Sequence, residues 1–239
     1  MTSLAPTDLE LMKIQIEALF THDDRGRIVT VNEPEGGPAP RFFFGRSSAG
    51  NRWRVRHDVP QAAARRLEAL AIREPVGGDP RAQPRRLDAM LAILGEAGEG
   101  RVGHVGPAYR FPEDLDAPTG VTRITASNAH LLRSMPTDFA DVERGLDAYE
   151  PRLVVIEDGV AVSICNSARL TDRAAEAGVD TLADYRRRGY AAKVVAAWAL
   201  AIRETGRTPL YSTSWDNLAS QAVARRLGLV RYGADLSLW

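Results

Sequence analysis

The stretch Gly189–Glu204, with the sequence GYAAKVVAAWALAIRE, constrains the fold most, because such an unbroken run of alanine and large apolar side chains is typical of a helix. Three arginines, Arg186 to Arg188, stand directly before it. The N-terminus of a helix already carries a partial positive charge, so further positive charge there is unfavourable by some tenths of a kcal/mol. This placement predicts that an anion binds at the start of the helix.

The residues before this helix strengthen that prediction. A strand is expected over about Ala174 to Leu182, so the loop RRRGYA joins a strand to a helix. Such a connection directs several unpaired backbone N–H groups outward, the arrangement that binds a pyrophosphate. Gly189 has no Cβ to block the approach of a phosphate, and the small Ala191 keeps the first helical turn open. From these residues alone, the alternative is an exposed basic turn with a glycine at the helix entry.

The second half of the chain alternates between strands and helices. Asp158-Gly159 predicts a tight hairpin, and Gly228 predicts the end of the last helix. The expected elements are a strand at 121–125, a short helix at 128–132, a second helix capped by Asp138, strands at 153–156, 160–165 and 174–182, the helix 189–204, a strand at 209–215, a helix at 217–227 and closing strands. Their order is β-α-α-β-β-β-α-β-α-β, an α/β (α+β) arrangement.

Two motifs in this half resemble those of the GNAT superfamily of N-acetyltransferases, which use acetyl-coenzyme A (acetyl-CoA). The family pattern Gln/Arg-x-x-Gly-x-Gly/Ala is matched by Arg186, Gly189 and Ala191. The later pattern, an Asn that opens a helix and a Gly with an apolar residue that close it, is matched by Asn217, Gly228 and Leu229. The resemblance covers about residues 119–239. It implies the GNAT acyltransferase fold with a mixed, centrally splayed sheet, and direct transfer of an acetyl group from acetyl-CoA to an amine acceptor.

The resemblance also implies which residues bind the cofactor. The backbone amides that would cradle the pyrophosphate are those of Arg187, Arg188, Gly189, Tyr190 and Ala191, with Arg186 completing the motif. Thr181 and Leu182 would lie at the splayed strand edge, where the pantetheine arm pairs like an added strand and the N–H of Leu182 reaches the acetyl carbonyl. Asn217 and Ser220 would face the cofactor from the following helix, although Asn217 is equally an ordinary helix N-cap.

The catalytic residues are harder to assign. An amine must be deprotonated before it attacks, and Glu176 lies where some family members carry the general base, although a surface glutamate is the alternative. The usual general acid of the family is a tyrosine seven residues after the Asn, and here that position is Ala224. We therefore take Tyr211 as the candidate acid, with Ser212, Ser214, Tyr232 or a water as alternatives. A non-catalytic acyl-CoA sensor, which kept the RRRGYA loop and lost its acid, is the second hypothesis.

The first part of the chain carries no functional motif. Helices are expected over 7–20, 61–71 and 85–94, and strands over 28–31, 41–44 and 52–56. In the last of these strands, an arginine row formed by Arg52, Arg54 and Arg56 is interpreted as a solvated face rather than a ligand site. The glycine-rich stretch 95–107 is interpreted as a linker or turn. The predicted domains are therefore 1–105, an α+β domain of unknown role, and 106–239, the acetyltransferase.

Composition limits the partners and cofactors that the protein is expected to bind. The 31 basic and 31 acidic residues cancel, which argues against a nucleic-acid partner, and no apolar run approaches transmembrane length, which argues against a membrane partner. Cys165 is the only cysteine, so neither a disulfide nor a cysteine metal cluster is expected, and acetyl-CoA is the only cofactor predicted. We expect a cytoplasmic protein. The identity of the amine acceptor and the formation of a homodimer stay open.

Overall fold

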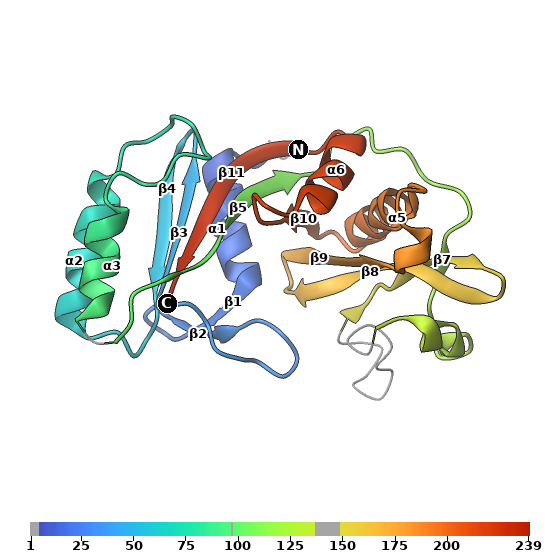
Figure 1. Cartoon of the computed structure of the whole chain (residues 1–239), viewed down its shortest axis with the longest axis horizontal. Helices are drawn as coiled ribbons and strands as arrows, with labels where there is room; N and C mark the ends of the chain where they lie inside the picture. The colour runs from blue at the N-terminus through green and yellow to red at the C-terminus, as the bar shows by residue number, and fades with distance from the viewer. Residues whose placement is uncertain (1–4, 97, 137–148) are drawn as a thin grey trace. The chain divides into compact units, whose positions relative to one another are not determined.

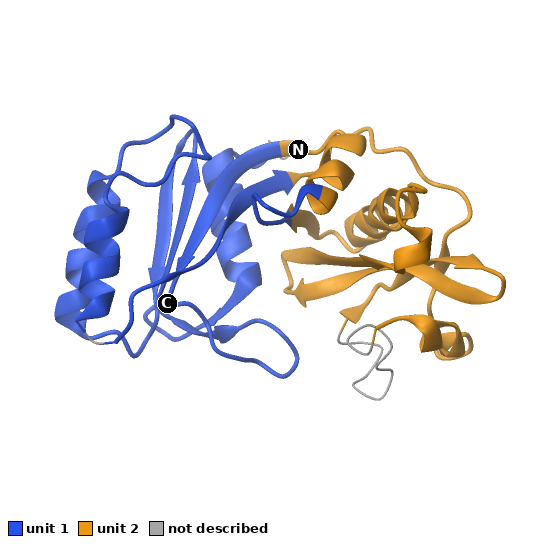
Figure 2. Ribbon diagram, viewed as in Figure 1, with its two compact units in different colours: residues 1–109, 212–218, 231–239 blue, residues 110–211, 219–230 orange. Residues whose placement is uncertain are grey.

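The computed structural model describes residues 5–96, 98–136 and 149–239. It divides into two compact units (Figure 2). Unit 1 contains residues 1–109, 212–218 and 231–239, and unit 2 contains residues 110–211 and 219–230. The expected boundary near residue 106 lies close to the first of these divisions, but the chain returns to unit 1 twice, so the division by contacts is not a simple split of the sequence into halves.

Unit 1 begins with a helix whose start follows from its capping residues. Thr7 and Glu10 form a capping box at the N-terminus of α1. The elements of unit 1 are α1 (Asp8–Leu19), β1 (Phe20–His22), β2 (Ile28–Val31), β3 (Phe42–Ser47), β4 (Gly50–Val55), α2 (Gln61–Arg73), α3 (Leu87–Gly95), β5 (Val102–Arg110) and β11 (Val230–Leu238), with the last residue of β5 and the first of β11 counted in unit 2. The strands of its main sheet follow the order β4-β3-β11-β5.

The three phenylalanines of β3 explain how helices cover both faces of this sheet (Figure 1). Side chains alternate along a strand. Phe42 and Phe44 pack in one cluster with Leu67 of α2 and Met90 of α3. Phe43 points to the other face, where its ring lies 5.4 Å from that of Phe20, which directly follows α1. The sheet therefore lies between α2 and α3 on one side and α1 on the other.

The linker interpretation of 95–107 is wrong from Val102 onward, because β5 begins there; α3 ends at Gly95. Two of the glycines serve close packing rather than flexibility. A Cβ on Gly103 would lie 2.1 Å from the indole nitrogen of Trp239, and one on Gly106 would lie 1.8 Å from the carbonyl oxygen of Thr213. These positions exclude any side chain, so the glycine content that suggests a turn is required by neighbours close to the strand.

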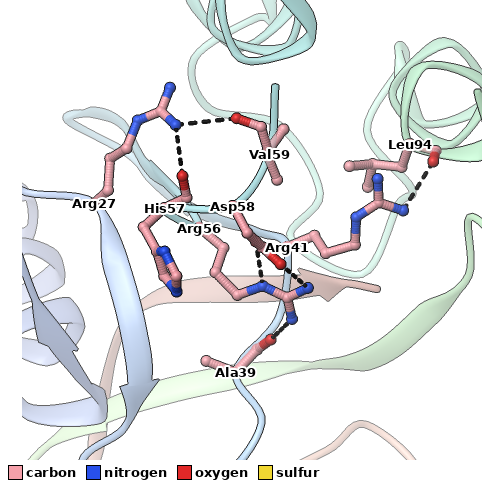
Figure 3. Close-up of polar contacts among 8 residues, drawn as sticks. All are labelled: Arg27, Ala39, Arg41, Arg56, His57, Asp58, Val59 and Leu94. Atoms are coloured by element: carbon pink, nitrogen blue, oxygen red, sulfur yellow. Dashed lines mark hydrogen bonds and ion pairs between the residues drawn. The ribbon is translucent and has the colours of Figure 1, made fainter. Parts of the chain in front are cut away.

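Several arginines of unit 1 hold its loops rather than a ligand (Figure 3). Arg56 forms an ion pair with Asp58 and donates to the carbonyl of Ala39. Arg27 donates to the carbonyl oxygens of His57 and Val59 at 3.2 and 3.0 Å. These contacts give Arg56, at the end of the predicted arginine row, a structural role within unit 1.

Unit 2 is a mixed sheet with a long helix on one face. Its elements are β6 (Thr122–Arg123), the 3-10 helix η1 (Ala129–Ser134), β7 (Leu153–Glu157), β8 (Val160–Leu170), β9 (Ala174–Thr181), the 3-10 helix η3 (Ala183–Tyr185), α5 (Tyr190–Glu204), β10 (Thr208–Ser212) and α6 (Leu218–Arg226); the last residue of β10 and the first of α6 are counted in unit 1. The strand order is β10-β9-β8-β7-β6. The predicted order of elements is confirmed where residues are described, with a 3-10 helix in place of the first short helix. The helix expected after Asp138 lies outside the described residues.

A different helix packs on each face of the unit 2 sheet. Trp198 of α5 donates to Ser167 of β8 at 3.1 Å, whereas Ile164 of β8 packs with Leu132 of η1. Because residues 164 and 167 point to opposite faces of the strand, α5 and η1 lie on opposite sides of the sheet. The described helices include none long and apolar enough to cross a membrane, and the same ranges gather no three metal-ligating side chains.

The predicted splay of the sheet is confirmed between β9 and β10. These parallel strands pair only from Ala174 to Glu176 on β9 and from Thr208 to Leu210 on β10. Strand β9 continues to Thr181 with β8 as its partner. Past Glu176, one edge of β9 is therefore free of ladder bonds to β10, and this edge leads directly to the loop before α5.

Candidate functional site

The N-terminus of α5 presents backbone donors that the chain does not use. Gly189 is the N-cap, its φ is 85°, and no side chain caps the helix. Within the described ranges, the N–H groups of Gly189, Tyr190 and Ala191 donate to no carbonyl or side chain. Three adjacent donors at the positive end of a 15-residue helix form an anion-binding site.

Two of the three arginines before α5 shape the turn itself. Arg186 folds back and donates through Nε to the carbonyl oxygen of Thr181 at 3.1 Å. Arg188 donates through Nη2 to the carbonyl oxygen of Asp184 at 3.1 Å, and its guanidinium lies 5.0 Å from the ring centre of Tyr185. These two side chains therefore bind the carbonyl oxygens of Thr181, at the end of β9, and of Asp184, within η3. Their charges are held beside the loop.

The third arginine differs from its neighbours. Arg187 has a φ of 62°, a left-handed conformation that is unusual for a residue with a side chain. It is exposed, and its guanidinium has no hydrogen-bond or ion-pair partner in the part of the chain that the structure describes. It remains available to an anion at the loop.

A fourth arginine lies against the same loop, and sequence reasoning missed it. A Cβ on Gly189 would lie 3.1 Å from Nη2 of Arg226, so that guanidinium lies directly over the N-cap of α5. Arg226 is exposed and has no partner among the described residues. The N–H groups of Leu229 and Gly228 close α6 by donating to the carbonyl oxygens of Ala224 and Arg225, a Schellman motif that fixes where the last turn ends. The sequence signals only an arginine in that last turn, which by itself indicates compensation of the helix dipole.

The free edge of β9 includes Thr181, as expected, but not Leu182. The N–H of Leu182 already donates to the carbonyl oxygen of Val162 at 3.0 Å, so it is not available to an acetyl carbonyl. Backbone groups of successive residues alternate between the two edges of an antiparallel strand. Thr181 and Val179 therefore direct their backbone groups toward the splayed side. The N–H of Thr181 is bonded to the carboxylate of Asp180 at 2.8 Å, which leaves Val179 as the residue with an unbonded edge.

The comparisons with known proteins agree with this geometry. Residues 124–234 match the family model described as GNAT acetyltransferase. This part of the chain belongs to the GNAT superfamily. No curated protein shows significant sequence similarity to the chain.

Among solved structures, a GCN5-related N-acetyltransferase from Kribbella flavida covers 99% of this chain and 96% of its own, with 18% identity and a TM-score of 0.50. A GNAT-family acetyltransferase from Colwellia psychrerythraea covers 78% and 75%, with 14% identity and a TM-score of 0.49. The aminoglycoside N-acetyltransferase AAC(6′)-Iy in complex with CoA covers 47% and 92%, with 22% identity and a TM-score of 0.39. The first of these likenesses shows that the fold of the whole chain occurs in another GNAT protein.

A tyrosine of α5 ties the GNAT loop to β7. The hydroxyl of Tyr190 donates to Oε1 of Glu157 at 2.6 Å. This hydrogen bond raises the pKa of Tyr190, since the neighbouring carboxylate disfavours a second negative charge. The first residue of α5 is thereby anchored by its side chain, while its backbone N–H stays available.

The candidate acid Tyr211 lies beside α6. Its hydroxyl is 2.6 Å from Oγ of Ser220. Ser220 is one helical turn before Ala224, so the two residues share a face of α6. Ala224 itself is buried, with 1% of its surface exposed. The structure therefore brings Tyr211 and Ser220 together one turn from the position of the usual family tyrosine.

The remaining candidates lie apart from that pair. Glu176 is buried on β9, opposite Arg169 of β8 and Leu210 of β10. Tyr232 belongs to unit 1, where its hydroxyl donates to Gln15 at 3.0 Å. Asn217 directly precedes α6, as expected, and is exposed in a segment counted with unit 1.

Proposed function

We propose that the chain is an N-acetyltransferase that moves an acetyl group from acetyl-CoA to an amine. The observation that carries the proposal is the row of unused N–H donors from Gly189 to Ala191, which follows a strand with a splayed edge. A pyrophosphate is the group that such a helix N-terminus binds, and an extended pantetheine arm is the group that such an edge binds.

The roles of the loop residues follow from their contacts. Arg187, Arg188, Gly189, Tyr190 and Ala191 supply the backbone cradle. Arg186 acts indirectly, because its guanidinium holds the end of β9 through Thr181. Arg187 and Arg226 place two unpaired guanidinium groups at the cradle, where each forms charge-assisted hydrogen bonds to phosphate oxygens. Asn217 contributes by position, because it opens α6, and Leu182 ties the end of β9 to β8 through its N–H.

The chemistry needs a base and an acid. The acceptor nitrogen attacks the thioester carbon after losing a proton to Glu176, the C–N bond forms, and the C–S bond breaks. The departing sulfur takes a proton from Ser220, which is resupplied by the hydroxyl of Tyr211 at 2.6 Å and finally by solvent. This hydroxyl pair takes the place of the family tyrosine that is absent at Ala224.

The test of this function measures binding and turnover separately. CoA at a hundredfold excess over its dissociation constant should stabilise the protein by about 2.7 kcal/mol. Pantetheine at the same concentration lacks the pyrophosphate and should stabilise the protein less. Acetyl-CoA with a panel of amines should release free thiol. Equal protection by CoA and pantetheine contradicts the phosphate cradle.

A non-catalytic acyl-CoA sensor is the second candidate, because the usual acid position holds the buried Ala224. The two candidates differ in one result. A protein that binds CoA tightly but releases no thiol with any amine is a sensor, whereas acceptor-dependent thiol release identifies an enzyme.

A further inference from the structure

Unit 1 contains a pocket that the acetyltransferase proposal does not use. The pocket has a volume of about 180 Å³. It lies at the end of the β3 strand and is bordered by the loop that follows α2 and by the start of β11. The lining residues that carry the argument are Arg46, Arg231, Ser48, Asp8, Gly77 and Gly78.

Arg46 forms no ion pair with any described residue. Its Nη2 donates to the carbonyl oxygens of Pro80 and Ala82 at 3.0 and 2.8 Å. Its Nε is buried and has no acceptor within the described ranges. Burial lowers the pKa of Arg46, and Glu74 and Asp79 oppose that shift from beyond ion-pair distance. A desolvated guanidinium held only by neutral carbonyls is unfavourable unless an anion completes its shell.

The rest of the lining is suited to such an anion. Arg231 is exposed at the pocket and has no partner in the described part of the chain. Gly77 and Gly78 have φ values of 81° and 90°, and no atom lies within 4 Å of where their side chains would be. No described residue accepts a hydrogen bond from the N–H of either glycine. Two arginines and two glycines whose N–H groups have no acceptor among the described residues therefore line the same pocket.

One acidic residue limits the charge of the pocket. Asp8 also lines it, and its Oδ2 accepts a hydrogen bond from Ser48 at 2.9 Å. The lining thus carries two positive charges and one negative charge, which favours a small ligand of low negative charge over a polyanion such as a nucleic acid.

We propose that this pocket binds a small oxyanion, a carboxylate or phosphate group, between Arg46 and Arg231. The planar guanidinium of Arg46 is held in place by the carbonyl oxygens of Pro80 and Ala82. Its remaining N–H groups donate to two oxygens of the anion. Arg231 and the amides of Gly77 and Gly78 bind the oxygens on the open side. Every group that binds the anion belongs to unit 1, whereas the α5 loop belongs to unit 2.

The test uses the full chain labelled with 15N. Sodium phosphate and, in a second arm, sodium acetate replace sodium chloride at constant ionic strength. The amide signals of Gly77 and Gly78 should shift and saturate in at least one arm, and a response to phosphate alone or to both anions identifies the group that is bound. The amide signal of Gly189 reports any phosphate at the α5 loop separately, so failure of the CoA site and failure of this pocket are distinguishable.

Two variants complete the test. Arg231→Gln should weaken the anion about tenfold, because it removes a charged hydrogen bond without disturbing a buried residue. Arg65→Gln, which removes an exposed arginine of α2 outside the pocket, is the control for net charge. The proposal is overturned if neither anion produces a saturable shift at Gly77 and Gly78, or if Arg65→Gln weakens binding as much as Arg231→Gln.

Discussion

Arg226 gives the sharpest test of the phosphate cradle, because it was not part of the family pattern and the structure alone places it at Gly189. Its Nη2 lies 3.1 Å from the position of a Cβ on that glycine, and its guanidinium has no hydrogen-bond or ion-pair partner in the described part of the chain. Arg226→Gln should therefore weaken CoA binding while leaving the fold unchanged, since no hydrogen bond or ion pair among the described residues is lost.

The expected magnitude follows from exposure. A hydrogen bond to a charged group contributes about 1.5–3 kcal/mol, whereas exposed ion pairs contribute about 0.2–1 kcal/mol. Arg226 is exposed, so we take about 1 kcal/mol. That free energy corresponds to an increase of about fivefold in the dissociation constant of CoA.

Arg225→Gln is the matched control. Arg225 is the preceding residue of the same helix turn, is also exposed, and its loss changes the net charge and the dipole environment of α6 equally. Calorimetric titration with CoA at 0.15 M salt screens long-range effects beyond about 8 Å, so Arg225→Gln should change the affinity less than twofold. If the two variants weaken CoA equally, Arg226 acts through net charge alone and the contact assigned to it is wrong.

Four further changes test the rest of the site. Gly189→Ala should cost about 1–2 kcal/mol of stability, because φ is 85°, and should also weaken CoA by displacing the guanidinium above it; a thermal melt and a titration measure the two effects. Tyr211→Phe should lower kcat about 10²-fold or more with little change in CoA affinity, because it interrupts the proton relay through Ser220; an unchanged kcat would eliminate Tyr211 from that relay. Ala224→Tyr should destabilise by about 1–3 kcal/mol rather than speed turnover, because the position is buried; a faster, equally stable variant would contradict this packing. Tyr190→Phe should remove a stabilisation that is present below pH 10 and is lost as the pH rises through the raised pKa of Tyr190, which melts at pH 8 and pH 11 would reveal.

The sequence predicts those parts of the fold that depend on local backbone chemistry. Asp158 and Gly159 have φ values of 48° and 77°, as a two-residue hairpin turn requires, and Gly228 ends α6 with a φ of 63°. The sequence does not predict strand β5, because two of its glycines are required by the close approach of Trp239 and Thr213, residues more than a hundred positions away. Local patterns carry no information about such close approach.

The same distinction separates the predicted and the missed parts of the site. The loop motif fixes where the unpaired amides lie, because the start of a helix leaves its first N–H groups without acceptors whatever surrounds it. The partners of the side chains depend on tertiary structure. The engagement of Leu182 by Val162 and the contact of Tyr211 with Ser220 both join residues of different elements.

The arginines around α5 now account for the unfavourable charge at its N-terminus. Arg186 and Arg188 are bound to carbonyl oxygens, so part of the repulsion is offset inside the loop itself. Among the described residues, Arg187 and Arg226 have no such partner; Arg187 precedes the unbonded amides in the loop, and Nη2 of Arg226 lies over Gly189. A site with two uncompensated cations and a row of free donors is less stable empty than occupied by a diphosphate, which accepts from all of them at once. Under the proposed function, the charge that disfavours the empty loop favours bound CoA, so replacing Arg187 or Arg226 should weaken CoA binding.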